Sequence, residues 1–303
     1  MTRRHTCIPW TPAERALVAE LFAQGKTSAE IAETLREKGI KRTQKAILHQ
    51  RNAHGWHAQV APSPVLRQEG PLTATGDMLV LADPHCPFHD ATWVNRCISL
   101  AVKWGITLAG IAGDLIDWSA FSVYGRVAEV EAEDEIRAAE QFTRTLATAF
   151  ESVYYAPGNH EVRLARITGY ALSLERLADW WITRDNVHTT DRHWFWLESG
   201  GQRYRITHPH NYSRIPANNS AKLCAKYGAH VIAGHSHHWG MAQDVTGRRL
   251  GVDTGMCADL QRLDYVQTRD TNNPTMAQGA CVVKAGVCYL LSPLNIAGYE
   301  SLT

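Results

Sequence analysis

The chain has 303 residues, with 45% hydrophobic and 20% charged side chains and a formal net charge of +1, which is ordinary for a soluble globular protein. No apolar run reaches the roughly 18 residues that a membrane-spanning helix needs, and the N-terminal arginines are not followed by the apolar segment of a secretory signal. The seven cysteines are scattered and form no CxxC pair, so we predict a cytoplasmic protein with reduced thiols and no membrane association.

Charge is distributed unevenly along the chain. Residues 1–60 contain ten Lys or Arg and five Asp or Glu, whereas residues 61–303 contain 21 Lys or Arg and 25 Asp or Glu. A basic head on a mildly acidic body indicates two modules with different partners. We therefore predict a small N-terminal domain over 1–59, a linker over 60–76, where three prolines occur without clear periodicity, and a larger domain over 77–303.

Three short helices are predicted in the N-terminal domain. Capping residues and apolar spacing place their N-caps at Thr11, Ser28 and Thr43, and the first two end near Gly25 and Gly39. Trp10, the segment "GKTSAEIAETL" and the segment "RTQKAI" resemble the helix-turn-helix and Myb-like tri-helical domains. Trp10 and Trp56 are expected to close the core of this unit.

The resemblance implies that the third helix enters the major groove of DNA. Gln50 is expected to face outward from this helix. The side chains expected at the DNA are Lys41, Arg42, Gln44, Lys45, His49 and Arg51. The alternative is a helical docking module whose basic face is only solvated.

The body alternates apolar strands with helical stretches, which predicts an α/β layered sheet. The predicted strands cover 78–82, 106–112, 152–156, 204–207, 230–234 and 250–254. The predicted helices cover 90–104, 129–150, 161–181 and 217–227.

Polar side chains follow five of these strands directly. They are Asp83 and His85, Asp114 and Asp117, Asn159 with His160 and Glu161, His208 and His210, and His235 and His237. Because the carboxyl ends of strands line the ligand crevice of open α/β sheets, we expect these residues to converge. One such pattern alone is more often a turn with a core histidine, but five in succession indicate a functional site.

The ordered series D-x-H, G-D-x-x-D, G-N-H-E, H and G-H-x-H resembles the calcineurin-like metallophosphoesterase family between Asp83 and His237. The resemblance implies a layered β-sandwich flanked by helices, with the three-helix head outside it. Seven mixed oxygen and imidazole donors suit two divalent ions, of which we favour Mn, with Fe and Zn as alternatives. The resemblance implies that Asp114 bridges the two ions. It assigns one ion to Asp83, His85 and His237, and the other to Asn159, His208 and His235.

Further roles are implied for neighbouring residues. The resemblance makes His160 the group that protonates the leaving oxygen or stabilises its charge. Asp117 and Glu161 are expected to accept hydrogen bonds from imidazoles, or else to be ordinary turn carboxylates. Arg163 is expected either at a substrate phosphate or in a surface salt bridge.

Other polar and aromatic residues near the motifs receive structural interpretations. The additional histidines His210 and His238 are expected at the rim of the site. Trp194 and Trp196, which share a strand face, are expected in a core or cap cluster rather than as a platform for stacked bases.

The resemblance implies hydrolysis of a phosphate ester by a bridging metal-bound hydroxide. The basic head favours a phosphodiesterase or nuclease acting on DNA, because it would concentrate the enzyme on its substrate. One alternative is a phosphomonoesterase or nucleotide phosphodiesterase whose head serves assembly. Another is a DNA-binding regulator with an inactive phosphoesterase body. A homo-oligomer is compatible with the sequence and is not required by it.

Overall fold

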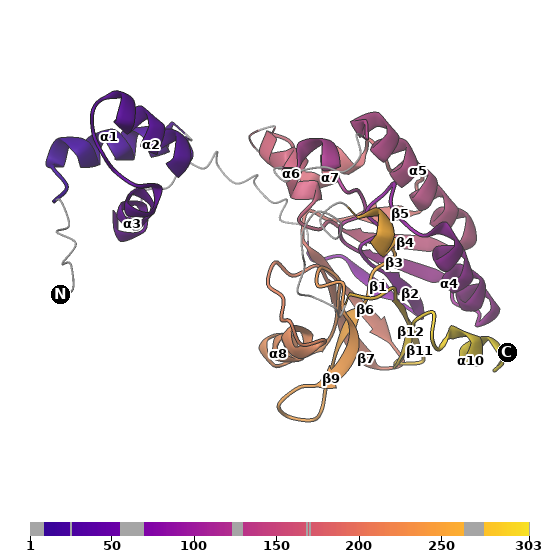
Figure 1. Cartoon of the computed structure of the whole chain (residues 1–303). Helices are drawn as coiled ribbons and strands as arrows, with labels where there is room; N and C mark the ends of the chain where they lie inside the picture. Colours follow the sequence, from indigo (N-terminus) through magenta and orange to yellow (C-terminus); the bar gives the residue numbers. More distant parts are fainter. Residues whose placement is uncertain are drawn as a thin grey trace. The chain divides into compact units, whose positions relative to one another are not determined.

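A computed structural model describes residues 9–24, 26–54, 70–122, 130–167, 169, 171–263 and 276–302. The chain divides into two compact units, Met1–Ser63 and Pro64–Thr303 (Figure 1). Trp56 and most of the predicted linker lie outside the described residues. The last part of the predicted linker is not a linker, because Thr73–Thr75 forms strand β1.

The N-terminal unit contains α1 (Pro12–Ala23), α2 (Ser28–Glu37) and α3 (Gln44–His54). Thr11 caps α1 as predicted, but α2 is capped by Thr27 and not by Ser28. The Thr27 backbone is extended and its hydroxyl accepts the amide of Glu30, which is the geometry of a capping box. A small apolar core lies between the helices and comprises Val18, Leu21, Phe22, Ile31, Leu35 and Ile47.

The larger unit is built on two six-stranded sheets. In order across the first sheet are β1, β6 (Trp194–Ser199), β7 (Gln202–Thr207), β8 (His230–Ala233), β10 (Leu250–Thr254) and β9 (Trp239–Gln243). In order across the second are β12 (Val287–Leu291), β11 (Ala280–Lys284), β2 (Met78–Leu81), β3 (Leu108–Ala112), β4 (Ser152–Ala156) and β5 (Val187–Thr189). Strands β2 to β5 are parallel, as are β7, β8 and β10.

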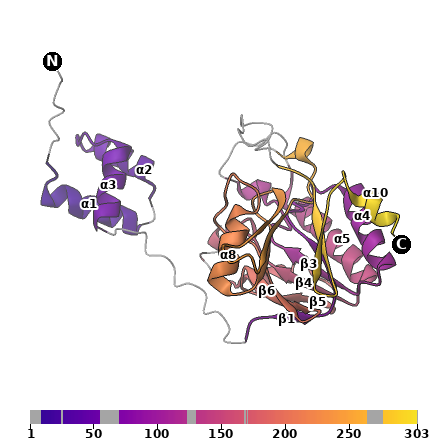
Figure 2. The same ribbon diagram turned by 90° about the horizontal axis from the view of Figure 1, so that it is seen from below.

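Helices cover the sheets on their outer sides (Figures 1 and 2). Helices α4 (Ala91–Lys103) and α5 (Ala132–Ala149) pack on the second sheet, and α8 (Asn218–Tyr227) packs on β8 and β10 of the first. The remaining helical elements are α6 (Glu161–Ile167), α7 (Leu174–Ala178), α10 (Ile296–Glu300) and the short 3₁₀ turns η1 (Ser119–Phe121) and η2 (Leu260–Arg262).

The continuous apolar sequence of β2 follows from this layering. Met78 and Val80 are buried in the cluster shared by the two sheets, whereas Leu79 and Leu81 are buried in the cluster shared with α4 and α5. Successive side chains of a strand point to opposite faces, so a strand covered on both sides is apolar at every position. The predicted β-sandwich flanked by helices is confirmed.

One predicted helix is wrong. The segment 161–181 contains two short helices, α6 and α7, because Gly169 has a positive φ of 61° and Ser173 caps a new helix. The six predicted strands are all present, while β1, β5, β9, β11 and β12 were not predicted. Strand β6 was expected only as the strand face that carries Trp194 and Trp196. None of the described helices combines the length and apolar character needed to cross a membrane.

Candidate metal centre

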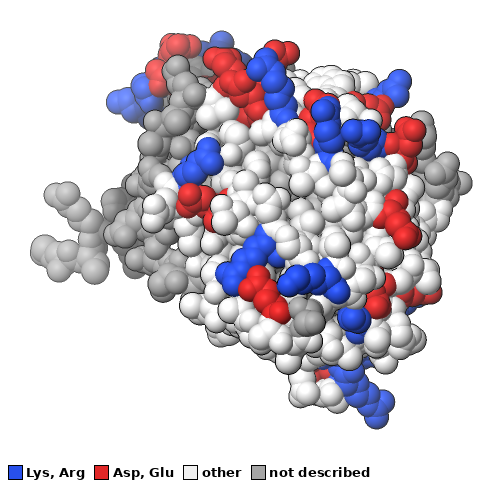
Figure 3. All heavy atoms as spheres, turned by 90° about the vertical axis from the view of Figure 1, so that its right-hand side faces the viewer, with Lys and Arg blue, Asp and Glu red and all other residues white. Residues whose placement is uncertain are grey.

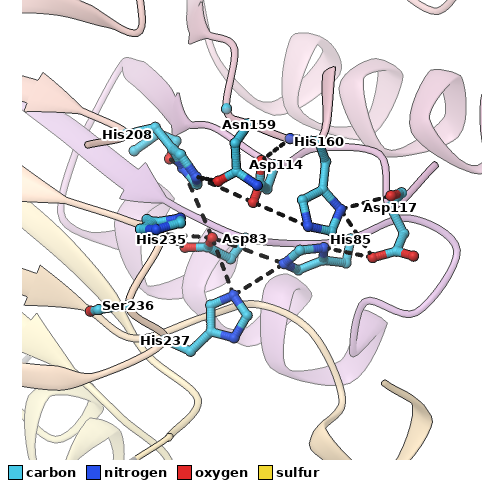
Figure 4. A network of polar contacts seen from close by, with 12 residues as sticks. Asp83, His85, Asp114, Asp117, Asn159, His160, His208, His235, Ser236 and His237 are labelled. Atoms are coloured by element: carbon cyan, nitrogen blue, oxygen red, sulfur yellow. Dashed lines mark hydrogen bonds and ion pairs between the residues drawn. The ribbon is translucent and has the colours of Figure 1, made fainter. Parts of the chain in front are cut away.

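The polar side chains that follow β2, β3, β4, β7 and β8 converge at one place, where the carboxyl ends of strands from both sheets meet (Figure 4). The structure brings together all seven side chains that the sequence predicted as metal ligands. Six of them form two groups of three donors, and Asn159 lies beside His208 of the second group.

The first group consists of Asp83, His85 and His237, whose donor atoms lie within 4.8 Å of one another. His85 Nε2 is 3.1 Å from His237 Nε2, and His237 Nε2 is 3.4 Å from Asp83 Oδ1. His85 Nδ1 is 2.9 Å from Asp117 Oδ1 and donates its proton to that carboxylate. In neutral His85 the lone pair on Nε2 therefore points toward Nε2 of His237, and both nitrogens are positioned to bind a metal ion.

The second group consists of Asp114, His208 and His235. His208 Nδ1 donates to the carbonyl of Ala112 at 2.9 Å, which directs Nε2 into the site. That Nε2 lies 3.0 Å from Asn159 Oδ1 and 3.2 Å from Asp114 Oδ2. Three acceptor atoms thus face one another, and such an arrangement needs either a proton or a cation between them.

The backbone is unusual at most of these ligands. Five of the seven have φ in the left-handed region, which side-chain-bearing residues rarely adopt: Asp83 (51°), His85 (46°), Asp114 (47°), His235 (78°) and His237 (56°). Each such residue costs on the order of 1–3 kcal/mol, and this kind of strain concentrates at functional sites. Glycines make room for the ligands, since a Cβ on Gly158 would collide with the carboxylate of Asp114, and one on Gly113 with the imidazole of His208.

Burial and charge set the protonation of the ligands. Burial lowers the pKa of His85, and burial together with His208 lowers that of His235 to about 4, so both imidazoles are neutral and able to bind a cation. Burial opposes ionisation of Asp114, but the neighbouring His160 and His208 hold its pKa well below the usual range. Against the effect of burial, Asp114 raises the pKa of His208 to about 10.

The donor set fits two divalent cations. Imidazoles, carboxylates and one amide oxygen converge on two neighbouring points, and mixed N and O donors suit ions such as Mn, Fe or Zn. Asp83, His85 and His237 would hold one ion, and Asn159, His208 and His235 the other, with Asp114 between them.

His160 lies at the edge of this set. Its Nδ1 donates to the backbone carbonyl of Asp117 at 2.7 Å, and its Nε2 is 3.7 Å from Asp114 Oδ2 and 2.9 Å from Arg163 Nη2. Burial would lower the pKa of His160, but the carboxylates of Asp114 and Asp117 raise it. Because Nδ1 is engaged, Nε2 is the atom through which His160 can exchange a proton. His160 also forms a donor group with His85 and Asp114, so distance alone would permit it as a ligand.

Asp117 and Arg163 hold His160 and His85 in place. Asp117 Oδ1 accepts from His85 Nδ1 and is 3.2 Å from His160 Nδ1, while Arg163 Nη1 donates to the Asp117 carbonyl at 2.8 Å. The predicted contact between Asp117 and imidazoles is present in the structure. Arg163 is half-buried beside His160, and not in the surface salt bridge that was the alternative.

Two expectations about neighbouring residues are wrong. Glu161 does not orient an imidazole through its carboxylate; Oε1 accepts the amide of Ile116 and Oε2 that of Gly158, so it ties together the loops after β3 and β4. His238 is fully buried and is not a rim residue, because the chain turns inward into β9. His210 is exposed, as expected.

His193 was not predicted. Its Nδ1 donates to the carbonyl of Pro157 at 2.7 Å, and its own carbonyl accepts the amide of His208 at 2.9 Å. It therefore connects the loop that carries Asn159 with the strand end that carries His208. Its sequence context, "DRHWFW", contains no spacing signal, because the relevant partners are backbone groups of distant segments.

The residues predicted to contact DNA lie in two environments. Lys41, Gln44, Lys45 and His49 are exposed, and Arg51 is half-buried near the ring of Phe22. Gln50, expected to face outward, is buried.

Arg42 belongs to the interior of the head. Its guanidinium pairs with Glu14 at 2.8 Å, donates to the Pro9 carbonyl and lies 4.4 Å from the centre of the Trp10 ring. The expectation that Arg42 contacts phosphate is corrected, because this side chain instead fastens the loop before α3 to the start of α1.

Two stacked sheets with clustered Asp, His and Asn donors at their strand ends form a site suited to divalent metal ions. Residues 77–239 match the model of the calcineurin-like phosphoesterase family, which is more than half of the chain, and the protein belongs to this family. No match was found among curated proteins.

Solved structures similar to the chain have low sequence identity to it. Yfce, a phosphoesterase from E. coli, is 16% identical with a TM-score of 0.41, over 71% of this chain and 92% of that chain. Vacuolar protein sorting 29 from Cryptosporidium parvum is 10% identical with a TM-score of 0.37, and the match covers 71% of this chain and 95% of that chain. Its Entamoeba histolytica counterpart, crystallised with Zn²⁺, is 14% identical with a TM-score of 0.34, over 71% and 98%.

Proposed function

We propose that this protein is a phosphodiesterase that cleaves DNA, with the larger unit performing the hydrolysis and the N-terminal unit holding the nucleic acid. The observation that supports the hydrolase is the convergence of seven donors at the ends of five strands. Five of these donors lie on strained backbone, which a structural turn would not require. The intact donor set also argues against an inactive body.

Different residues of the chain would bind the cations and transfer the proton. Two bound cations would supply Lewis acidity toward the phosphate and toward a water molecule. Asp83, His85, Asp114, Asn159, His208, His235 and His237 hold these cations. In its imidazolium form, His160 would give the Nε2 proton to the leaving oxygen while Nδ1 donates to the Asp117 carbonyl. Burial opposes this form, but the carboxylates of Asp114 and Asp117 favour it, since they raise the pKa of His160.

The N-terminal unit supports DNA as the substrate. Lys41 is exposed in the loop before α3, Lys45 is exposed in its first turn, and His49 is exposed one turn further along the helix. Lysine side chains at the start of a helix can neutralise phosphates without reading a sequence. Tethering such a unit to a hydrolase raises the local concentration of substrate.

The face of the larger unit shown in Figure 3 carries no broad basic surface among its described residues. On the face shown in Figure 3, the described acidic and basic side chains are interspersed, as on an ordinary solvated surface. This part of the larger unit therefore offers no alternative track for the backbone of a nucleic acid.

The proposal is tested with the full chain, manganese, and plasmid and single-stranded DNA. We expect cleavage by the wild type and loss of cleavage in His160→Ala. The double variant Lys41→Gln and Lys45→Gln should weaken DNA binding and reduce its dependence on salt, whereas Arg15→Gln on α1 serves as a matched control. Faster hydrolysis of p-nitrophenyl phosphate than of its bis ester, with DNA left intact, would favour the phosphomonoesterase instead.

A further inference from the structure

A cleft of about 470 Å³ lies beside the metal centre. It is lined by side chains from α6, α7 and the segment that leads into β6. Among them are Arg166, Arg192, His193, His210, Leu172 and Leu174. Its volume falls in the range of roughly 300–1,000 Å³ that is typical of sites for small organic ligands.

The wall of the cleft is hydrogen-bonded to the loops that carry two of the metal ligands. His193, in its wall, donates to the carbonyl of Pro157 at 2.7 Å, two residues before Asn159, and accepts the amide of His208 at 2.9 Å. His210, also in the wall, stacks edge-on against His193 with 4.8 Å between ring centres and lies two residues after His208. A ligand in the cleft would therefore lie next to a group bound at the metal centre.

The lining combines positive charge with apolar surface. Arg166 and Arg192 face the cleft, against one carboxylate, Asp191, whose Oδ1 already accepts the amide of Glu175 at 2.8 Å. Leu172 and Leu174 supply apolar surface, and Leu172 is 36% exposed although it is a large aliphatic side chain. Such a lining suits a ligand that is anionic at one end and apolar at the other.

Trp194 also lines the cleft but is not a stacking platform. The guanidinium of Arg205 covers its ring at 3.6 Å, which leaves the aliphatic side chains as the apolar contacts. We therefore infer that an arginine guanidinium of the cleft contacts a phosphate of the ligand, and that the leucine side chains pack against a ring of the same ligand.

We propose that this cleft holds the nucleotide that adjoins the scissile phosphate, with Arg192 at its phosphate and Leu172 and Leu174 against its nucleoside. The proposal rests on the phosphodiesterase function and makes it more specific, since the substrate extends beyond the reacting phosphate on the side of His193. The contacts of His193 with both ligand loops favour a nucleotide over an unrelated anion, because consecutive phosphates of one strand would then lie at the cleft and at the metal centre.

The test separates binding from hydrolysis. Binding of thymidine 5′-monophosphate to the full chain is measured by ligand-observed NMR in EDTA, with inorganic phosphate and thymidine as reference probes. We expect the nucleotide to bind more tightly than either probe. Arg192→Gln and Leu172→Glu should each weaken nucleotide binding by about tenfold. Arg203→Gln is the matched control, because Arg203 lies on the adjacent strand β7 over Trp196 and outside the cleft.

A second measurement uses the metal-loaded enzyme. Arg192→Gln should raise KM for a thymidine dinucleotide about tenfold, whereas Arg203→Gln, outside the cleft, should leave this KM unchanged. Equal effects of Arg192→Gln and Arg203→Gln on nucleotide binding would overturn the cleft proposal. So would nucleotide binding no tighter than that of phosphate, or tighter binding of a phosphoserine peptide. Tight nucleotide binding without any dinucleotide cleavage would support the cleft and refute the phosphodiesterase.

Discussion

Replacement of Asp117 by Asn tests how the metal centre is assembled. Asp117 is not among the predicted ligands, but its carboxylate accepts the His85 Nδ1 proton at 2.9 Å and lies 3.2 Å from His160 Nδ1. Its side chain is only 10% exposed, so solvent screens these contacts weakly. A hydrogen bond to a charged group contributes about 1.5–3 kcal/mol, and the partners of metal-binding histidines typically account for about 10–100-fold in affinity.

We therefore expect Asp117→Asn to weaken cation binding by about 10–100-fold, as measured by calorimetry with Mn²⁺. The variant should also lower the pKa of His160, because Asp117 is one of the carboxylates that raise it. Activity that needs protonated His160 would then decline at a lower pH than in the wild type. Asp134→Asn, at an exposed position in the first turn of α5, is the control.

Two results would refute this reasoning. An unchanged cation affinity would show that His85 needs no carboxylate to orient it. A loss far beyond about 100-fold would show that Asp117 is itself a ligand.

Three further predictions concern proton transfer, pH and the head. His160→Gln should reduce kcat by about 10²–10⁴-fold with cation affinity nearly unchanged, and a parallel loss of cation binding would identify His160 as a ligand. Because the pKa of His208 is about 10, cation binding to this imidazole must displace a proton. Calorimetry in buffers of different ionisation enthalpy should detect the released proton. Cation affinity should rise by up to about tenfold per pH unit toward pH 10. The hydrogen bond from Arg42 and the backbone amide of Thr11 lower the pKa of Glu14 from 4.5 to about 2. The contribution of ionised Glu14 to folding stability is therefore complete above pH 4.5 and is lost as the pH falls through 2. Glu14→Gln should thus lower the melting temperature of the N-terminal unit at pH 7, with variant and wild type converging near pH 2; a constant difference across that range would contradict the ion pair.

Much of the fold follows from local patterns. The six apolar runs predicted as strands are strands, because residues covered by sheet on one side and helix on the other must be apolar at every position. The break between α6 and α7 was missed because the sequence from 161 to 181 keeps a helical spacing of apolar residues across Gly169. Strands such as β12, whose residues alternate between exposed and buried, gave weaker signals than the buried parallel strands.

The head shows where local reasoning fails. Arg42 was predicted at the DNA because it is a cation beside the third helix, yet it is anchored by Glu14, 28 residues earlier. Gln50 was expected to face outward, and it is buried. Helical spacing defines faces, but which face the neighbouring helices cover is decided only when they pack.

The sequence alone determined the chemical inventory of the site, because the ligands follow apolar strands directly and so must lie at strand ends. Tertiary structure decided which atoms meet. The direction of His208 Nε2 is set by the carbonyl of Ala112, the orientation of His85 by Asp117, and the link between His193 and both ligand loops by backbone groups. Hydrogen-bond partners this far apart in the chain leave no spacing pattern, since their contact depends on the stacking of two sheets and not on distance along the sequence.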